Sequence, residues 1–334
     1  MTGAVLWSLR AECPIAPRIS PYADAVQRWL VDELLPGLDL PLDAAARRRL
    51  AAAGVARYAG RLYPGATEAD LRVLTALFTW FFLVDDACDG PQRLAPDEIR
   101  ALRTGTLTVL HGGARLRSPG LDGGLRRLLV RAWREPRRRM PARWRTRVAD
   151  AVAHHLDGTW REAVGKAAGH RPGVAEYIEL RRATSAAYLS YPLVEFVTGR
   201  PLPDAVYHHP ALRRVADTGN DLLSWYNDLA SLDREQPTAV GHNLVLAVAG
   251  ERRVPLAEAV ALVADRWRES MRRFVELRAA VPSFGRAVDA AVGDHLDVIA
   301  NAVRGTIDWT VESTRYAGKE GPLLNASGRA GAPS

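Results

Sequence analysis

The sequence is short of the residues that mark several large classes of protein. Its two cysteines, Cys13 and Cys88, make no disulfide framework, which predicts a reducing, cytoplasmic environment. No stretch approaches the ~18 uncharged apolar residues of a membrane span, so we expect no membrane partner. Residues 1–14 lack the basic start and apolar run of a signal peptide. Alternating runs of β-branched residues are also absent, which argues against a β-sheet fold.

Lysine is scarce as well. Lys166 and Lys319 are the only lysines, so arginine carries nearly all of the basic charge behind the net charge of +7. The basic excess lies between Arg115 and Arg147, but neither zinc-finger spacing nor an RNA-binding aromatic motif accompanies it. We interpret this run as a solvated basic face and expect no nucleic-acid partner. A milder alternative is a positive potential that attracts an anionic small substrate.

What the sequence does contain is helical periodicity. Hydrophobic residues make up 48% of the 334 residues, enough for a sizeable core, and they recur at spacings of three and four. Glycine and proline separate the segments, with Pro136 among the predicted breaks. The predicted helices span residues 22–35, 43–62, 67–88, 95–111, 121–134, 140–164, 173–199, 210–231, 240–249, 255–280 and 283–316. We expect one all-α domain over residues 21–317, between a loose segment 1–20 and a flexible tail 318–334.

Pro192 lies inside the helical pattern of residues 173–199. It cannot donate a hydrogen bond to the carbonyl of Tyr188, which predicts a kink or a break nearby. The break belongs either to a substrate pocket or to a simple helix end, and the residues leave both open.

An acidic cluster, Asp85, Asp86 and Asp89, precedes a predicted helix end at Gly90-Pro91. Side chains three and four positions apart share one side of a helix, so these carboxylates come together. Their mutual repulsion and the helix macrodipole both cost stability there unless a cation compensates. Hard oxygen ligands suit magnesium, which often shares phosphate oxygens. The cluster predicts either a magnesium site or a solvated, charged helix end.

Three aromatic residues, Phe78, Phe81 and Phe82, lie on the Asp85 side of the same predicted helix. Phenylalanine at this spacing is usually core. An apolar wall that runs up to acidic ligands would nevertheless suit an apolar diphosphate ester.

A second polar cluster follows about 130 residues later. Asn220, Ser224 and Asp228 are spaced four and four, so they span only about 80° of one helix face. An amide oxygen, a hydroxyl and a carboxylate on one stripe make a plausible one-ion site. The alternative is a polar outer face on which Asn220 caps a helix. The first cluster in the same chain favours the metal site.

Together these clusters resemble the two metal motifs of class I terpene synthases, especially the bacterial single-domain cyclases. The family carries an aspartate-rich motif and then Asn-Asp-x-x-Ser-x-x-x-Glu. Here Asp85-Asp86-x-x-Asp89 and Asn220-Asp221-x-x-Ser224-x-x-x-Asp228 stand in their places. The similarity covers roughly residues 20–317.

Three further segments carry the resemblance in the expected order. Arg-Arg-Ala-Thr-Ser-Ala at 181–186 is similar to the segment with the diphosphate-sensing arginine, best assigned to Arg182. Trp309 with Arg315-Tyr316 is similar to the C-terminal element that closes over the diphosphate. His-Asn-Leu-Val at 242–245 is similar to the stretch after the second metal motif.

The resemblance implies an all-α class I terpenoid synthase barrel with three Mg²⁺ ions across its mouth. Arg182, Arg315 and Tyr316 would then bind the diphosphate, since guanidinium groups bind phosphate oxygens bidentately and stay charged. Without the resemblance we would interpret these arginines as salt bridges and the tyrosine as packing. Ionisation also requires a closed apolar pocket with aromatic faces that stabilise a carbocation. The candidates for this lining are Phe78, Phe81, Phe82, Tyr188 and Trp309.

The sequence departs from the family pattern at three positions. Asp228 stands where glutamate is usual, which shortens that ligand by one methylene. Asn227 replaces a common lysine or arginine, and Ala186 replaces a usual glycine. These departures put metal affinity and catalytic rate in question.

The resulting prediction is a Mg²⁺-dependent cyclase of bacterial secondary metabolism that acts on a linear prenyl diphosphate, alone or as a homodimer. Farnesyl diphosphate and a sesquiterpene product are favoured, and a diterpene cyclase acting on geranylgeranyl diphosphate is the alternative. A chain-elongating prenyltransferase would need a second aspartate-rich motif. A non-catalytic helical binding protein is the alternative from another class.

Overall fold

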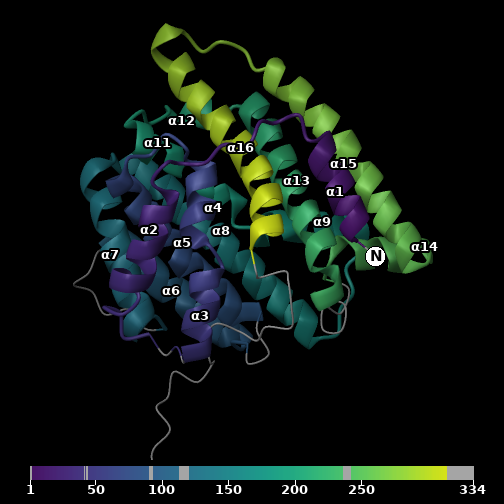
Figure 1. The fold of residues 1–334 in the computed structure, drawn as a ribbon, viewed down its shortest axis with the longest axis horizontal. Coiled ribbons are helices and arrows are strands. Elements are labelled where there is room, and N and C mark those ends of the chain that lie inside the picture. The colour runs from purple at the N-terminus through teal and green to yellow at the C-terminus, as the bar shows by residue number, and fades with distance from the viewer. Residues whose placement is uncertain are drawn as a thin grey trace, which may run out of the picture.

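The computed structural model describes residues 2–40, 42, 44–89, 93–112, 120–235 and 242–313. These residues form helices and one π-helical segment, η1, and no strand, which confirms the all-α prediction (Figure 1). The elements are α1 (Gly3–Glu12), α2 (Ala23–Trp29), η1 (Leu30–Leu34), α3 (Ala44–Ala52), α4 (Val55–Leu62), α5 (Glu68–Asp89), α6 (Pro96–Gly112), α7 (Gly123–Arg139), α8 (Ala142–Ala167), α9 (Val174–Thr184), α10 (Ala187–Ser190), α11 (Leu193–Thr198), α12 (Asp204–Tyr207), α13 (Pro210–Glu235), α14 (Leu244–Arg252), α15 (Leu256–Ala279) and α16 (Arg286–Glu312).

The long helices pack in a connected series. α13 packs against both α15 and α16, and the three run side by side in Figure 1. α16 also packs on α4, and α4 on α5; α8 packs on α6 and on α9, and α9 returns to α13. This series brings α5, α9, α13 and α16, which carry the predicted site residues, into one assembly.

Helix α5 is buried on most of its surface, which is unusual for a helix that ends in acidic residues. Leu71, Leu74 and Phe78 are buried, as their three-and-four spacing predicts, but Trp80 on another face is buried too. A helix that is apolar on more than one face must lie inside the protein, and α5 does so between α4, α7 and α2.

Residues 173–199 form three helices rather than the one predicted. The break at Pro192 is confirmed, since α10 ends at Ser190 and α11 begins at Leu193. An earlier break at Ala186 was not predicted. Ala186 has φ 60°, in the left-handed region. Alanine is a strong helix former, so nothing local in the sequence indicates this break.

Two smaller helix predictions also need correction, and one short helix was missed. The predicted helix 43–62 divides at Gly54, whose φ of 66° suits glycine. Pro136 does not end α7, which continues to Arg139 because the carbonyl of Pro136 still accepts a hydrogen bond from Met140 N. The short helix α12 was not predicted; it follows Pro203.

The N-terminal residues are ordered, so the prediction of a loose segment 1–20 is wrong for α1. Leu9 is fully buried, and Tyr226 Oη donates to the carbonyl of Leu6 at 3.2 Å. Arg268 on α15 holds Glu12 at 2.7 Å. These tertiary contacts order a short helix whose sequence alone shows little amphipathic pattern. The tail from Gly318 lies outside the described residues.

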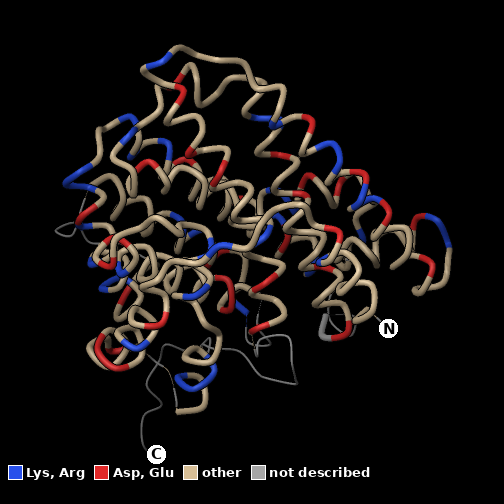
Figure 2. Tube along the Cα trace, turned by 45° about the horizontal axis from the view of Figure 1, so that its top comes forward, with Lys and Arg blue, Asp and Glu red and all other residues tan. Residues whose placement is uncertain are grey.

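Basic and acidic residues are interspersed along the helices (Figure 2). In the arginine-rich end of α7, Arg138 binds Glu135, and Arg139 pairs with Asp70 on α5. Arg137 donates to the carbonyl of His111 at 3.1 Å. None of the helices in the described part of the chain is both long and apolar enough to span a bilayer.

Candidate active site

The first acidic cluster lies in the last turn of α5. Asp85 and Asp86 are half-buried, and α5 ends at Asp89, whose side chain is outside the described part. That turn contains no basic residue to offset the partial negative charge of the helix end. The local sequence therefore leaves a concentration of negative charge that favours a bound cation.

His155 on α8 lies near this cluster and was not predicted. Its Nδ1 donates to the carbonyl of Ala183 on α9 at 3.2 Å. Burial lowers the pKa of His155, and the negative charge of Asp85 opposes that lowering. The residue therefore links α8 to the end of α9 beside the acidic cluster. No motif in the sequence indicates it.

The second cluster is almost completely buried on α13. Asn220 is 0%, Ser224 1% and Asp228 2% exposed, so the alternative of a polar outer face is wrong. Ser224 Oγ donates to Asn220 Oδ1 at 3.0 Å, and Asn220 Nδ2 donates to the carbonyl of Arg182 at 2.9 Å. The two oxygens that the sequence predicted as ligands thus lie together with a fixed orientation, as an oxygen-preferring cation requires.

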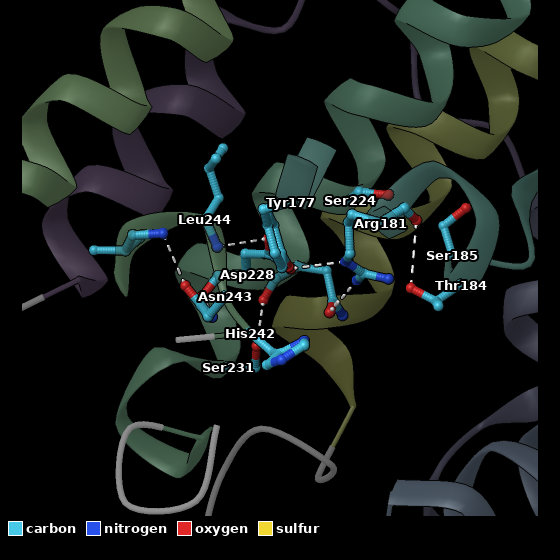
Figure 3. A network of polar contacts seen from close by, with 12 residues as sticks. Tyr177, Arg181, Thr184, Ser185, Ser224, Asp228, Ser231, His242, Asn243 and Leu244 are labelled. Atoms are coloured by element: carbon cyan, nitrogen blue, oxygen red, sulfur yellow. Dashed lines mark hydrogen bonds and ion pairs between the residues drawn. The ribbon is translucent and has the colours of Figure 1, made fainter. Parts of the chain in front are cut away.

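Asp228 has different surroundings from the other two members (Figure 3). Its Oδ1 accepts a hydrogen bond from Arg181 Nε at 3.0 Å. Its Oδ2 accepts one from Tyr177 Oη at 2.7 Å and one from the backbone N–H of Leu244 at 3.1 Å. Burial, followed by the charge of Asp228, raises the pKa of Tyr177, so its phenol stays protonated as the donor. The carboxylate is therefore bound by protein donors from two other helices.

The two arginines of the predicted diphosphate segment point to different acids. Arg182 binds Asp221 through two parallel hydrogen bonds of 2.7 Å, which raise the pKa of its guanidinium. Arg181 binds Asp228 and also Asn227 Oδ1 at 3.1 Å. Of the two guanidinium groups, that of Arg181 binds a predicted metal ligand. Its spacing of four from Tyr177 is the one sequence signal that places both on one helix face.

Three predicted pocket residues form an aromatic cluster with Tyr58 on α4. The Tyr58 ring lies 4.9 Å from Trp309, 5.7 Å from Phe78 and 6.2 Å from Phe82, between ring centroids. Trp309 is held by a 2.7 Å hydrogen bond from Nε1 to the carbonyl of Ala53. The sequence did not single out Tyr58, because it lies on a separate short helix far from any motif.

The other two predicted pocket residues lie elsewhere. Phe81 packs against Trp80 and lines a small apolar cavity with Trp133 on α7. Tyr188 Oη donates to Asp217 Oδ1 at 2.6 Å, one turn before Asn220 on α13. Arg315 and Tyr316 lie outside the described residues, since the description ends at Ser313.

Comparison with known proteins gives one family. Residues 76–273 match the family described as terpene synthase family 2, C-terminal metal binding, and this span contains both polar clusters. The chain is 29% identical to sesquiterpene synthase 6 of Postia placenta, over 97% of this chain and 93% of that one. It is also 29% identical to a (+)-T-muurolol synthase of Roseiflexus castenholzii, described as (2E,6E)-farnesyl diphosphate cyclizing, over 91% and 92% of the two chains.

Solved structures of terpene synthases have the same fold as this chain. The linalool/nerolidol synthase of Streptomyces clavuligerus superposes with a TM-score of 0.78 at 26% identity, over 89% of this chain and 99% of that one. The all-helical arrangement, the paired polar clusters and the match across both clusters agree. The chain belongs to the terpene synthase family and is a class I terpene synthase with a divalent-metal-binding domain.

Proposed function

We propose that the protein is a Mg²⁺-dependent sesquiterpene cyclase that acts on farnesyl diphosphate. The observation that carries this proposal is the pair of oxygen-bearing faces, one ending α5 and one on α13, within a single metal-binding family match. In the reaction the bond between the allylic carbon and the diphosphate oxygen breaks, and its electron pair leaves with diphosphate. A double bond of the same chain attacks the cation and closes the ring. Loss of a proton from the cyclic cation then gives a hydrocarbon, whereas addition of water followed by loss of a proton gives an alcohol.

The names of similar proteins support a fifteen-carbon substrate. The Roseiflexus relative is described as cyclising farnesyl diphosphate, and the Postia relative as a sesquiterpene synthase. A structure of the Streptomyces synthase contains 2-fluorogeranyl diphosphate, at 26% identity and a TM-score of 0.78. That likeness supports a diphosphate ester in this fold but favours no chain length.

The donor set fits Mg²⁺. Asp85, Asp86 and Asp89 offer carboxylates, and Asn220 and Ser224 offer a buried amide oxygen and hydroxyl 3.0 Å apart. These residues would hold the ions, three in the full complex, and bound Mg²⁺ would neutralise charge on the departing diphosphate. Asp228, the remaining predicted ligand, is considered separately below because three protein donors already bind it.

Arginine completes the diphosphate site in this proposal. Arg182, bound through both its Nε and Nη2 to Asp221, can exchange that carboxylate for diphosphate oxygens without losing its charge. Arg315 and Tyr316 would add donors from the end of the chain beyond α16. Tyr58, Phe78, Phe82 and Trp309 would present ring faces to the carbocation and keep water away from it.

The test is incubation with Mg²⁺ and ten-, fifteen- or twenty-carbon prenyl diphosphates, followed by analysis of volatile products. A cyclic fifteen-carbon product from farnesyl diphosphate supports the proposal. A twenty-carbon cyclic product would replace it with a diterpene cyclase. No product from any substrate would make a non-catalytic helical binding protein the better interpretation.

Variants test the residue assignments. We expect Asp85→Ala, Asn220→Ala and Arg315→Ala to reduce turnover at least about 100-fold while leaving the circular dichroism of the helices unchanged. Arg138→Ala, at an exposed pair on α7, is the control and should retain full activity. Full activity in the three site variants would refute the assignment of both clusters.

A further inference from the structure

Asp228 connects three helices at one buried point. It lies on α13, and its donors Tyr177 and Arg181 lie on α9. The third donor is the backbone N–H of Leu244, the first residue of α14. Figure 3 shows these groups around the Asp228 carboxylate. A carboxylate on one helix that accepts hydrogen bonds from two others holds the three together in the way that a buried cross-link does.

The backbone around Asp228 strengthens this connection. The carbonyl of Asp228 accepts a hydrogen bond from Asn243 Nδ2 at 2.9 Å, and Asn243 Oδ1 accepts one from Val245 N at 2.9 Å. Asn243 is therefore the N-cap of α14 and is fixed to Asp228 at the same time. The carboxylate also lies at the positive end of the α14 macrodipole, where an anion is favoured.

The same contacts determine where Asn220 and Ser224 lie. Helix α9 touches α13 at Asn220, through the carbonyl of Arg182, and again at Asp228, eight residues later. Eight residues span about 12 Å of helix, and Ser224 lies midway between the two contacts. Because Asn220 Nδ2 is used by α9, its Oδ1 is directed to Ser224. The relative position of α9 and α13 thus sets the orientation of both oxygens.

We infer that Asp228 is a positioning residue that joins α9, α13 and α14 and thereby orients Asn220 and Ser224, rather than a metal ligand. The role of Asn220 and Ser224 toward Mg²⁺ rests on the proposed function, whereas the three-helix junction does not. The contacts around Asp228 also bear on Asp228→Glu. Glutamate is the usual residue of the family at this position, but an added methylene must displace donors packed around a side chain that is 2% exposed.

Stability without metal separates the two roles. In EDTA, we expect Asp228→Asn to lower the melting temperature by about 5 °C or more, because it removes the charge of a buried carboxylate that pairs with half-buried Arg181. Tyr177→Phe should lower it less, since one donor is lost. The double variant should fall by less than the sum of the two, because both act on one contact. Ser224→Ala leaves the contacts of Asp228 intact but removes one buried hydrogen bond, so it should lower the melting temperature less than Asp228→Asn does.

Metal binding supplies a readout that lost stability alone would not change. We would titrate Mg²⁺ in the presence of inorganic diphosphate by calorimetry at 20 °C. Both Asp228→Asn and Tyr177→Phe should weaken Mg²⁺ binding about 10-fold or more without abolishing it, as removal of an orienting partner does. Tyr177→Phe leaves the Asp228 carboxylate in place, so weaker Mg²⁺ binding in this variant reports on the orientation that the contacts around Asp228 impose.

Two results would overturn the inference. One is an Asp228→Asn protein whose melting temperature in EDTA equals or exceeds that of wild type. Such a result is expected if Asp228 is a metal ligand whose carboxylate is repelled by nearby negative charge when no metal is bound. The other is wild-type Mg²⁺ affinity in Tyr177→Phe. If the wild-type protein itself binds no Mg²⁺ with diphosphate, the proposed function fails, and the junction is still judged by the melting temperatures in EDTA.

Discussion

At the scale of single residues, Ala186 shows how tertiary structure imposes a conformation that its side chain resists. Its φ of 60° lies in the left-handed region, where a Cβ costs about 1–2 kcal/mol. The strain allows α9 to end and α10 to begin next to Arg182, Asn220 and Tyr188. The resemblance to the family indicated that glycine is usual at this position, and the backbone gives the reason.

We expect Ala186→Gly to stabilise the protein by about 0.5–1 kcal/mol. Relief of the left-handed strain is partly offset by the greater freedom of glycine in the unfolded chain. Urea denaturation measures the change in free energy of unfolding. Ala187→Gly, in the right-handed helix α10, is the matched control and should destabilise. A destabilised Ala186→Gly protein would contradict the account.

His295 gives a residue-scale prediction about acid. Burial, aided by the charge of Arg147, lowers its pKa from 6.5 to about 4. In the unfolded chain His295 therefore binds a proton below pH 6.5, whereas in the folded protein it binds one only near pH 4. The stability that neutral His295 contributes is fully present above pH 6.5. As the pH falls from 6.5 to 4, the free energy of unfolding decreases by about 3 kcal/mol on its account.

His295→Phe keeps an aromatic ring against Tyr207 but removes this titration. We expect its free energy of unfolding to fall less steeply than that of wild type between pH 6.5 and 4. Above pH 7 the free energies of unfolding of the two proteins should change with pH in the same way. Urea titrations at several pH values measure both slopes. Identical slopes below pH 6.5 would show that His295 is protonated as easily in the folded protein as in the unfolded chain.

At the scale of helices, the approach of α8 to α9 decides where the two arginines lie. A Cβ added at Gly158 on α8 would stand 2.6 Å from the Cβ of Ala183 on α9. Two small residues at one crossing thus let the helix backbones come together. The sequence shows both residues but gives no sign that they meet.

Gly158→Ala should push α9 away from α8 and cost about 1–3 kcal/mol, despite the better helix propensity of alanine. Because Arg181 and Arg182 follow α9, Mg²⁺-dependent turnover of farnesyl diphosphate should fall as well. Gly250→Ala on α14 is the control: no atom lies within 4 Å of the added Cβ, so stability should hold or rise. Equal effects of the two substitutions would refute the close approach.

At the scale of the whole molecule, Asp308 joins the two ends of the described chain. This buried carboxylate on α16 binds Arg304 at 3.0 Å, Arg61 on α4 at 3.2 Å and Arg10 on α1 at 3.3 Å. It stands next to Trp309 of the aromatic cluster. The N-terminal helix is therefore tied to the helix from which the predicted closing element continues.

Asp308→Asn should lower the free energy of unfolding by about 3–5 kcal/mol, because three arginines lose their buried counter-charge. Asp297→Asn on the same helix removes an exposed ion pair with Arg278 and should cost less than about 1 kcal/mol. Urea denaturation of both variants makes the comparison. Equal, small losses would show that solvent screens the Asp308 cluster.

Much of the site could be predicted from the sequence because its signals are local. A spacing of four along a helix places Asn220, Ser224 and Asp228 on one face whatever else the chain does, and helical periodicity gave the all-α fold. The aromatic cluster was predicted in part: Phe78, Phe82 and Trp309 meet, whereas Phe81, one residue before Phe82, points to a separate cavity.

The sequence by itself determined most of the long helices, the two polar clusters and the family, since each depends on residues close together in the chain. Only the tertiary structure decided what binds Asp228, where α9 breaks and which aromatic rings meet. These depend on contacts such as Tyr177 with Asp228 and Tyr58 with Trp309, between residues 51 and 251 positions apart. The packing of whole helices brings such pairs together, and no local pattern encodes it.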